Sequence, residues 1–164
     1  MPWAKKTYER INTVYKDVFD KIVMKERDRE LAVREVVIRM DILKRDFSKR
    51  QLTILNVIMT FSYFYGKESA WIPKLKDFAL AGVSPTKIKD ELETLVSKDV
   101  ITWHRGKDFN EFAINDPREW TTPYHSNFDG NRASELFLLN LKHADIPVDV
   151  DAIMDKVRVD DDLS

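Results

Sequence analysis

Positive side chains gather in the middle of the 164-residue chain, in a pattern that suits binding to the phosphates of a nucleic acid. Residues 1–42 hold ten Lys and Arg against eight Asp and Glu, whereas residues 43–107 hold twelve against seven. Residues 108–164 hold five against thirteen, so the net charge changes from +2 through +5 to −8 along the chain. Clusters of lysine and arginine are the electrostatic footprint of nucleic-acid binding. A solvated lysine-rich surface has the same composition, so charge alone leaves both interpretations open.

The candidate DNA contacts come from four short segments of this central region. Thr86, Lys87 and Lys89 open one predicted helix, where free amides and the positive end of the helix dipole also attract phosphate. The other candidates lie at the start of a second helix, on a short third helix and at the turn of a predicted hairpin. The predicted DNA-binding residues are Lys49, Arg50, Lys74, Lys76, Thr86, Lys87, Lys89, Arg105 and Lys107.

Acidic side chains share the helix that is predicted to enter the DNA groove. Asp90, Glu91 and Glu93 repel the phosphate backbone unless they lie over bases or point away from it. The alternative to DNA binding is therefore a domain of the same fold that contacts proteins.

Residues for catalysis, metal binding and nucleotide binding do not group together in the sequence. The three histidines, His104, His125 and His143, are scattered, and a zinc site needs clustered ligands. With four glycines in the chain, no Gly-rich phosphate loop is recognisable, and no Ser/His/Asp triad is credible. We interpret the run Asp160–Asp162 as a solvated tail rather than a cation site. We therefore expect no enzyme activity, no metal ion and no cofactor.

The chain has no cysteine, which excludes disulfides and thiolate ligands and favours a cytoplasmic protein. Its first residues lack the apolar run of a signal peptide. The longest apolar stretch, residues 52–65, is too short and too often interrupted by polar residues to span a bilayer. We expect a cytoplasmic protein with no contact with a membrane.

The elements that must position the basic residues follow the order of a winged helix-turn-helix domain, predicted over residues 46–115. A helix is predicted to begin at Asp46 or Ser48 and to end at Gly66. A proline favours an extended piece over residues 69–73, and a short helix over 74–80 follows. The inward residues predicted for the first helix are Leu52, Leu55, Ile58 and Met59.

A Ser-Pro pair gives the sharpest local signal for a helix start. Ser84 is a good N-cap, and Pro85 suits the first helical position, where no amide donor is needed. The helix is predicted to reach Lys98, and strands over 100–104 and 109–114 then form the wing hairpin. In this arrangement the helix reads the major groove, and the wing lies along the backbone or in the minor groove. The helix's inward residues are predicted to be Ile88, Leu92, Leu95 and Val96.

Aromatic side chains of the central region are assigned to packing rather than to base stacking. Trp71 and Trp103 fall in two strands that are expected to pair and to pack together in the wing sheet. A second aromatic group is assigned to the hydrophobic core, although for Tyr63 an exposed position is left open. This group consists of Phe61, Tyr63, Phe64 and Tyr65.

Helical segments are predicted on both sides of the central domain. Apolar stripes over residues 7–24 and from Asp28 onward predict a helical extension over 1–45, although residues 36–38 also suit a strand. The extension must pack on the domain or on a second copy, which leaves intramolecular packing and homodimerisation open.

The last third of the chain, residues 116–164, is predicted to hold a loop, short helices and an acidic tail. Apolar spacing indicates helices over 133–144 and 149–157. Its strong negative charge would keep it off DNA, so we interpret it as a partner-binding arm or a solvating tail. The whole chain is thus predicted to be mainly α, of the α+β class.

The central part of the chain resembles the N-terminal domain of the phage replication protein O family. The similar stretches are the capped helix start at 46–55, the turn at 64–67 and the entry into the Ser-capped helix at 80–88. Shorter matches are Trp71-Ile72, Leu92-Glu93 and the strand entry at 99–101. The resemblance implies origin-DNA binding and recruitment of the replicative helicase or its loader.

The sequence therefore predicts sequence-specific binding of double-stranded DNA by a phage-type replication initiator or organiser. Phosphate contacts would position the protein, and the third helix of the domain would read the bases. Two alternatives stay open: a transcriptional regulator with the same domain, and a protein-interaction adaptor or inhibitor built on a winged helix.

Overall fold

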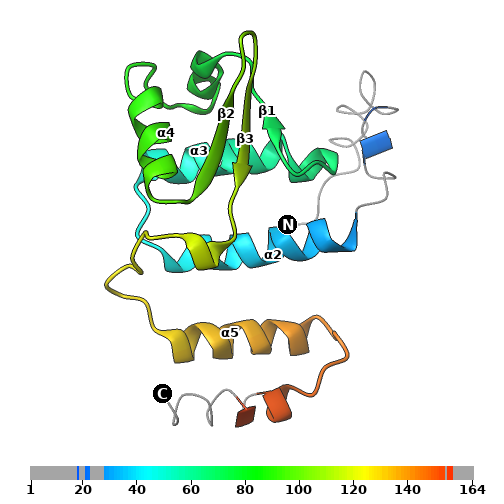
Figure 1. The fold of residues 1–164 in the computed structure, drawn as a ribbon. Helices are drawn as coiled ribbons and strands as arrows, with labels where there is room; N and C mark the ends of the chain where they lie inside the picture. Colours follow the sequence, from blue (N-terminus) through cyan, green and yellow to red (C-terminus); the bar gives the residue numbers. More distant parts are fainter. Residues whose placement is uncertain (1–17, 19–20, 23–27, 154, 157–164) are drawn as a thin grey trace, which may run out of the picture. The chain divides into compact units, whose positions relative to one another are not determined.

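The computed structural model describes residues 18, 21–22, 28–153 and 155–156, which belong to two compact units (Figure 1). The first unit is Met1–Pro123 and the second is Tyr124–Ser164. The helix predicted over residues 7–24 lies outside the described residues, except at positions 18, 21 and 22, which are helical.

Helix α2, Arg29–Lys44, begins where the sequence predicts it. The side chain of Asp28 accepts a hydrogen bond from the backbone N–H of Glu30 at 3.1 Å and so caps the first turn. Residues 36–38 are helical, so the alternative of a strand there is wrong. Leu31 and Ile38 are buried in the same hydrophobic core as the elements that follow, and this shared burial fixes the helix.

Helix α3, Lys49–Thr60, starts with a complete capping box. The N–H of Gln51 donates to Ser48 Oγ at 3.2 Å, and the N–H of Ser48 donates to Gln51 Oε1 at 2.9 Å. The buried face is Ile54, Leu55, Ile58 and Met59, whereas Leu52 is exposed, contrary to the prediction.

The region after α3 differs from the predicted long helix. α3 ends at Thr60, and a 3-10 helix, η1, follows at Tyr63–Tyr65. Gly66, with φ of 70°, ends η1 rather than α3. The assignment of the aromatic cluster is wrong for the same reason: the break turns Tyr63 inward, 2% exposed, and leaves its neighbours exposed. Those neighbours are Phe61, Phe64 and Tyr65.

Three short antiparallel strands form the sheet, in the order β1-β3-β2. They are β1 at Ala70–Trp71, β2 at Ile101–Arg105 and β3 at Asn110–Ile114. β3 therefore separates the two strands that were expected to pair (Figure 1). Trp103 packs on Phe112 of β3, with ring centroids 5.5 Å apart, but Trp71 is 60% exposed, so its predicted packing is wrong.

The 3-10 helix η2, Leu75–Ala81, and helix α4, Ile88–Ser97, form the helix-turn-helix. Gly82, with φ of 98°, ends η2 as predicted. The predicted N-cap at Ser84 is wrong: Lys87 is the N-cap, and Ser84 Oγ lies 3.2 Å from Thr86 Oγ1. A turn closed by the N–H of Lys87 on Ser84 O at 2.9 Å precedes the helix.

The core of the first unit joins α2, α3, η2, α4 and the sheet. Phe78 of η2 meets Phe112 of β3 edge to face at 5.4 Å, which binds the helix-turn-helix to the wing sheet. On α4, Ile88, Leu92 and Leu95 are buried, whereas Val96 is exposed, contrary to the prediction. The architecture is the predicted one: mainly α with a small antiparallel sheet, arranged as a winged helix-turn-helix.

The segment after β3 returns to the end of α2. It contains a 3-10 helix, η3, at Pro117–Glu119. The Arg45 guanidinium donates to Thr122 O at 2.7 Å and to Pro117 O at 3.1 Å. The N–H of Asp46 donates to Pro123 O at 2.8 Å, so residues 117–123 are held against the α2–α3 connection.

The second unit contains helix α5, Gly130–His143. Asp129 caps it by accepting from the N–H of Arg132 at 3.0 Å, so the helix begins three residues before the predicted start. Residues 150–153 and 155–156 are helical, in agreement with the predicted short helix. The acidic run Asp160–Asp162 lies outside the described residues.

Candidate nucleic-acid interface

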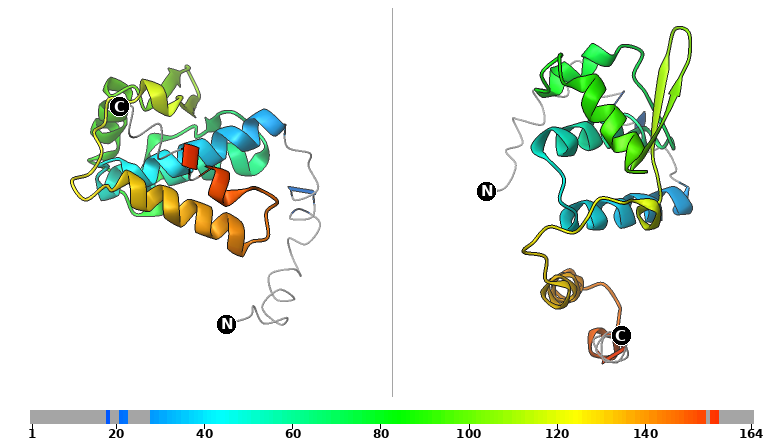
Figure 2. Two further views of the ribbon diagram at one scale, coloured as in Figure 1. Left: turned by 90° about the horizontal axis from the view of Figure 1, so that it is seen from below. Right: turned by 60° about the vertical axis from the view of Figure 1, so that its left-hand side comes forward.

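Three elements that carry predicted DNA contacts lie at one end of the first unit, away from α2. They are the wing turn between β2 and β3, the 3-10 helix η2, and the turn that leads into α4. Figure 1 and the right-hand view of Figure 2 place all three at the upper end of this unit. We call this surface the basic end. Its predicted contact residues are Lys74, Lys76, Thr86, Lys87, Lys89, Arg105 and Lys107.

All nine predicted contact residues are exposed. Thr86 and Lys87 lie in the turn before α4 and Lys89 lies in its first turn, so the corrected helix start leaves them at the opening of α4. Lys49 and Arg50 are not part of the basic end. They begin α3, directly after the short connection from α2.

Arg105 makes two contacts within the domain. Its guanidinium lies over the Trp103 ring, 3.6 Å from the centroid, and its Nη2 is 3.3 Å from Glu93 Oε1. Trp103 and Arg105 are two positions apart on β2, so their side chains share one face of the strand. Glu93 belongs to α4, and the ion pair therefore links the wing to the helix that is predicted to read DNA.

The wing is also held to the segment before η2. Trp103 Nε1 donates to Asn110 Oδ1 at 3.0 Å, and Asn110 Nδ2 donates to the carbonyl oxygen of Pro73 at 2.9 Å. Sequence reasoning missed Asn110 and Glu93 as partners. The alternation of Trp103 and Arg105 along β2 is the signal that was available; the partners are distant in sequence.

The outer face of α4 is acidic beyond its opening. Asp90 is exposed, Glu91 is half-buried, and Glu93 is paired with Arg105. The positive charge at the opening of α4 comes from Lys87 and Lys89, and the half-buried Lys98 is the C-cap at the other end of the helix. This arrangement permits phosphate contact at the helix opening and disfavours it along the rest of the helix.

Shifted pKa values occur in the regions of α2, η1 and η3. Hydrogen bonds from Arg118 hold the pKa of the exposed Asp116 carboxyl at about 2. Burial raises the pKa of the Tyr63 hydroxyl, and the nearby Arg34 guanidinium opposes that rise. A hydrogen bond to Glu30 raises the pKa of Arg34. Ion pairing causes the shifts of Asp116 and Arg34, and burial causes that of Tyr63.

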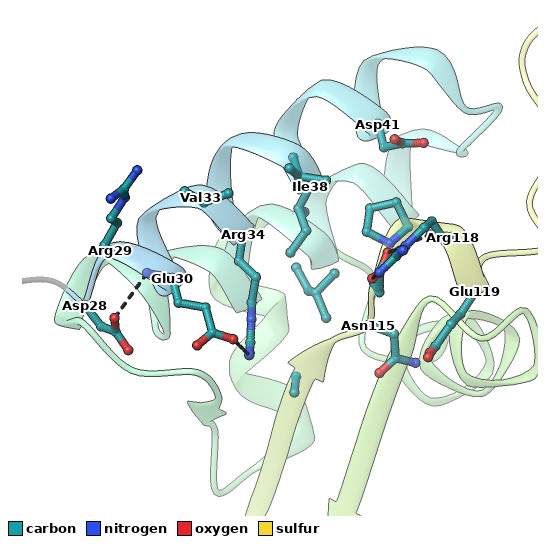
Figure 3. Close-up of a pocket in the computed structure, with 15 residues that line it drawn as sticks. Asp28, Arg29, Glu30, Val33, Arg34, Ile38, Asp41, Asn115, Arg118 and Glu119 are labelled. Carbon is teal, nitrogen blue, oxygen red and sulfur yellow. Dashed lines mark hydrogen bonds and ion pairs between the residues drawn. The ribbon is translucent and has the colours of Figure 1, made fainter.

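A groove of about 1090 Å³ runs between α2 and residues 113–119 (Figure 3). Two of its three arginines face carboxylates: Arg34 Nη2 lies 3.1 Å from Glu30 Oε1, and Arg118 Nη2 lies 2.7 Å from Asp116 Oδ2. Because these charges are paired, the groove has less affinity for a phosphate than an array of unpaired cations.

The described part of the chain lacks two further features. No group of three or more His, Asp or Glu side chains there is arranged to hold a metal ion. No helix in the same residues is long and apolar enough to cross a membrane.

The order of α3, β1, η2, α4 and the β2–β3 hairpin defines the class of protein, a winged helix-turn-helix protein. The model of the family described as Bacteriophage replication protein O matches residues 33–119, just over half of the chain. The chain belongs to this family, and the resemblance stated from the sequence is confirmed. The match spans most of α2, the helix-turn-helix, the wing and η3. No curated protein and no solved structure matches the chain.

Proposed function

We propose that this chain binds double-stranded DNA sequence-specifically through its basic end and acts as a phage replication initiator. The observation that carries the proposal is the gathering of exposed cations and the opening of α4 at one end of a replication protein O domain. In this role the protein would recruit the replicative helicase or its loader to the bound DNA.

The proposed binding mode places the opening of α4 in the major groove, which admits one helix. The residues at that opening, Thr86, Lys87 and Lys89, then enter the major groove. Lysines of η2 and of the wing contact the flanking phosphates. Arg105 positions the wing through Glu93 and Trp103 and adds its charge to the surface. The acidic remainder of α4 faces bases, where carboxylates accept hydrogen bonds from cytosine amino groups.

A binding measurement with the full chain tests this proposal. A duplex enriched from a randomised pool and a scrambled duplex of equal length are titrated at two salt concentrations, with fluorescence anisotropy as the readout. We expect the enriched duplex to bind at least about 10³ times more tightly, with an affinity that falls steeply as salt rises. Equal affinity for both duplexes, or no binding at the lower salt, contradicts the proposal.

The acidic face of α4 favours a second candidate function, a protein-interaction adaptor or inhibitor. In that case Asp90 and Glu93 would meet a basic protein surface, and duplex DNA would not bind. Co-purification of a host protein with the wild-type chain, lost in the variant D90K, would support this candidate in place of the first.

The proposed protein works by binding DNA and positioning its partners, without catalysis or a cofactor, and acts in the cytoplasm with the DNA.

We also propose that the chain forms a homodimer through α2. The support is an outward apolar stripe on a helix whose opposite face already fills the core. The stripe consists of Val33, Val36, Val37 and Leu43, all exposed. Paired domains of this class bind paired half-sites.

A further inference from the structure

An apolar groove of about 570 Å³ lies on the first unit, beside the strand β1. Its walls are the C-terminal half of α3, the segment from β1 to Pro73 and the end of η2. The side chains that matter most for its character are Phe61, Trp71, Leu80 and Asp77.

Large apolar side chains stand exposed around this groove. Leu80 is 91% exposed, Trp71 is 60% exposed and Phe61 is 43% exposed. Phe61 stacks on Tyr65 with ring centroids 6.3 Å apart, and Tyr65 meets Phe64 edge to face at 5.5 Å. The groove is therefore continuous with a surface of exposed aromatic rings, and contiguous apolar surface of this kind marks an interaction site.

The groove is separate from the contacts that join the wing to α4. β1 and β2 are the two edges of the sheet, with β3 between them (Figure 1). Trp71 lies on β1, whereas Arg105 lies on β2 and pairs with Glu93 of α4. A ligand in the groove therefore does not meet these contacts, although η2, which carries Lys76, borders both the groove and the basic end.

The negative charge of Asp77 indicates which kind of ligand fits the groove. Asp77 is the one ionisable residue among those that line the groove, and Thr60 Oγ1 already donates to Asn56 O at 2.8 Å. A carboxylate repels the phosphates of a single strand that would stack on Phe61 and Trp71. A symmetric contact with a second copy would bring two such carboxylates toward one interface, which is also unfavourable.

We propose that this groove binds an amphipathic helix of another protein, with apolar side chains over Phe61, Trp71 and Leu80 and a lysine or arginine near Asp77. Helices dock in apolar grooves through side chains at positions i, i+3 or i+4, and i+7. This inference goes beyond duplex binding and does not depend on it. It gives the recruitment part of the proposed function a surface distinct from the wing and from the opening of α4.

The probes are two synthetic helical peptides of about 14 residues, roughly 21 Å of helix, with the same leucine face. One carries lysines beside that face and the other carries glutamates; both are labelled and titrated with the full chain in an anisotropy assay. We expect the lysine peptide to bind at least tenfold more tightly than the glutamate peptide. L80S, which removes the apolar contact without adding a charge, should weaken lysine-peptide binding at least tenfold, and D77K should reverse the preference between peptides.

Leu43 provides a matched control, because it is also an exposed leucine, at 73%, but lies on α2 outside the groove. L43S should leave peptide binding unchanged, and the uncharged variant L80S should leave duplex binding unchanged. Four outcomes overturn the inference: no binding of either peptide, equal binding of both, equal loss in L43S and L80S, or single-stranded oligothymidine binding that L80S abolishes. A failure of duplex binding alone would contradict the proposed function and leave this inference standing.

Discussion

Arg105 is an exposed cation that also helps to position the wing against α4. Its guanidinium stacks on Trp103 and meets Glu93 across the gap between the wing and α4. Stacking of this kind suits arginine, whose planar group contacts a ring face and a carboxylate together. Arg105 therefore helps to fix the orientation of the wing relative to α4.

A double-mutant cycle measures this link. We expect R105A and E93Q to show a coupling free energy of about 0.2–1 kcal/mol in urea denaturation, since both side chains are about half exposed. The coupling should shrink at high salt, because exposed ion pairs are screened. Strictly additive effects of the two substitutions at low salt would show that Glu93 and Arg105 are not coupled. R105K should retain the ion pair with Glu93 but lose most of the stacking on Trp103.

Tyr63 makes stability depend on pH at the alkaline end. Burial raises the pKa of its hydroxyl above the ordinary value of 10, so the folded chain holds that proton longer than the unfolded chain. The contribution is complete below pH 10 and is lost as pH rises from there through the folded-state pKa. We expect Y63F to lose less stability than the wild type on this rise, in denaturant titrations at each pH. Y124F, which changes an exposed tyrosine, should lose as much stability with rising pH as the wild type does. If Y63F also loses as much as the wild type, Tyr63 does not cause the pH dependence.

At the scale of elements, two serines show what a helix cap requires. Ser48 is followed at the third position by Gln51, which completes a reciprocal capping box. Ser84 is followed there by Lys87, whose side chain has no acceptor for the serine N–H, and Ser84 Oγ lies against Thr86 instead.

The two caps should differ in their contribution to stability. We expect S48A to lower the free energy of unfolding by about 1 kcal/mol, as loss of an N-cap does. S84A should change it by less than about 0.5 kcal/mol, as for a surface substitution away from a cap. Urea denaturation of both variants checks this, and equal losses would show that Ser84 caps α4 after all.

Helix α2 carries apolar residues on two faces, and the proposed dimer uses the outer one. V36E should shift the full chain from dimer to monomer in analytical ultracentrifugation, because it places a charge in the apolar contact. V96E, at an exposed valine on α4, should leave the association unchanged. A wild-type chain that stays monomeric at all concentrations tested would end the dimer proposal.

Local sequence signals predicted those parts of the fold that local chemistry decides. The starts of α2 and α3, the Gly82 turn and the hairpin follow from caps, turn residues and apolar alternation. The aromatic cluster was misplaced because helical spacing cannot show that α3 stops at Thr60. Charge predicted the exposed cations, but the pairing of Arg105 with Glu93 depends on tertiary packing.

Across the whole molecule, charge separates the parts that favour DNA from those that avoid it. The central region carries the net positive charge, whereas residues 124–164 hold four Lys and Arg against nine Asp and Glu, a net charge of −5. An acidic arm is repelled by the duplex, so the proposed binding mode leaves it in solvent, where it can contact a partner. The basic end and the groove beside β1 then give the chain two recognition surfaces, with η2 at the border between them.

The central claim is that the opening of α4 contacts DNA, and charge reversal at its two lysines tests it most directly. Affinity for an enriched duplex is measured at several salt concentrations for the wild type, K87E/K89E and the control K21E/K142E. The control reverses two exposed lysines outside the basic end. We predict that K87E/K89E binds at least tenfold more weakly, with a salt slope smaller by about 1.8 for two lost phosphate contacts, while the control matches the wild type. Wild-type affinity and slope in a folded K87E/K89E protein would contradict the account.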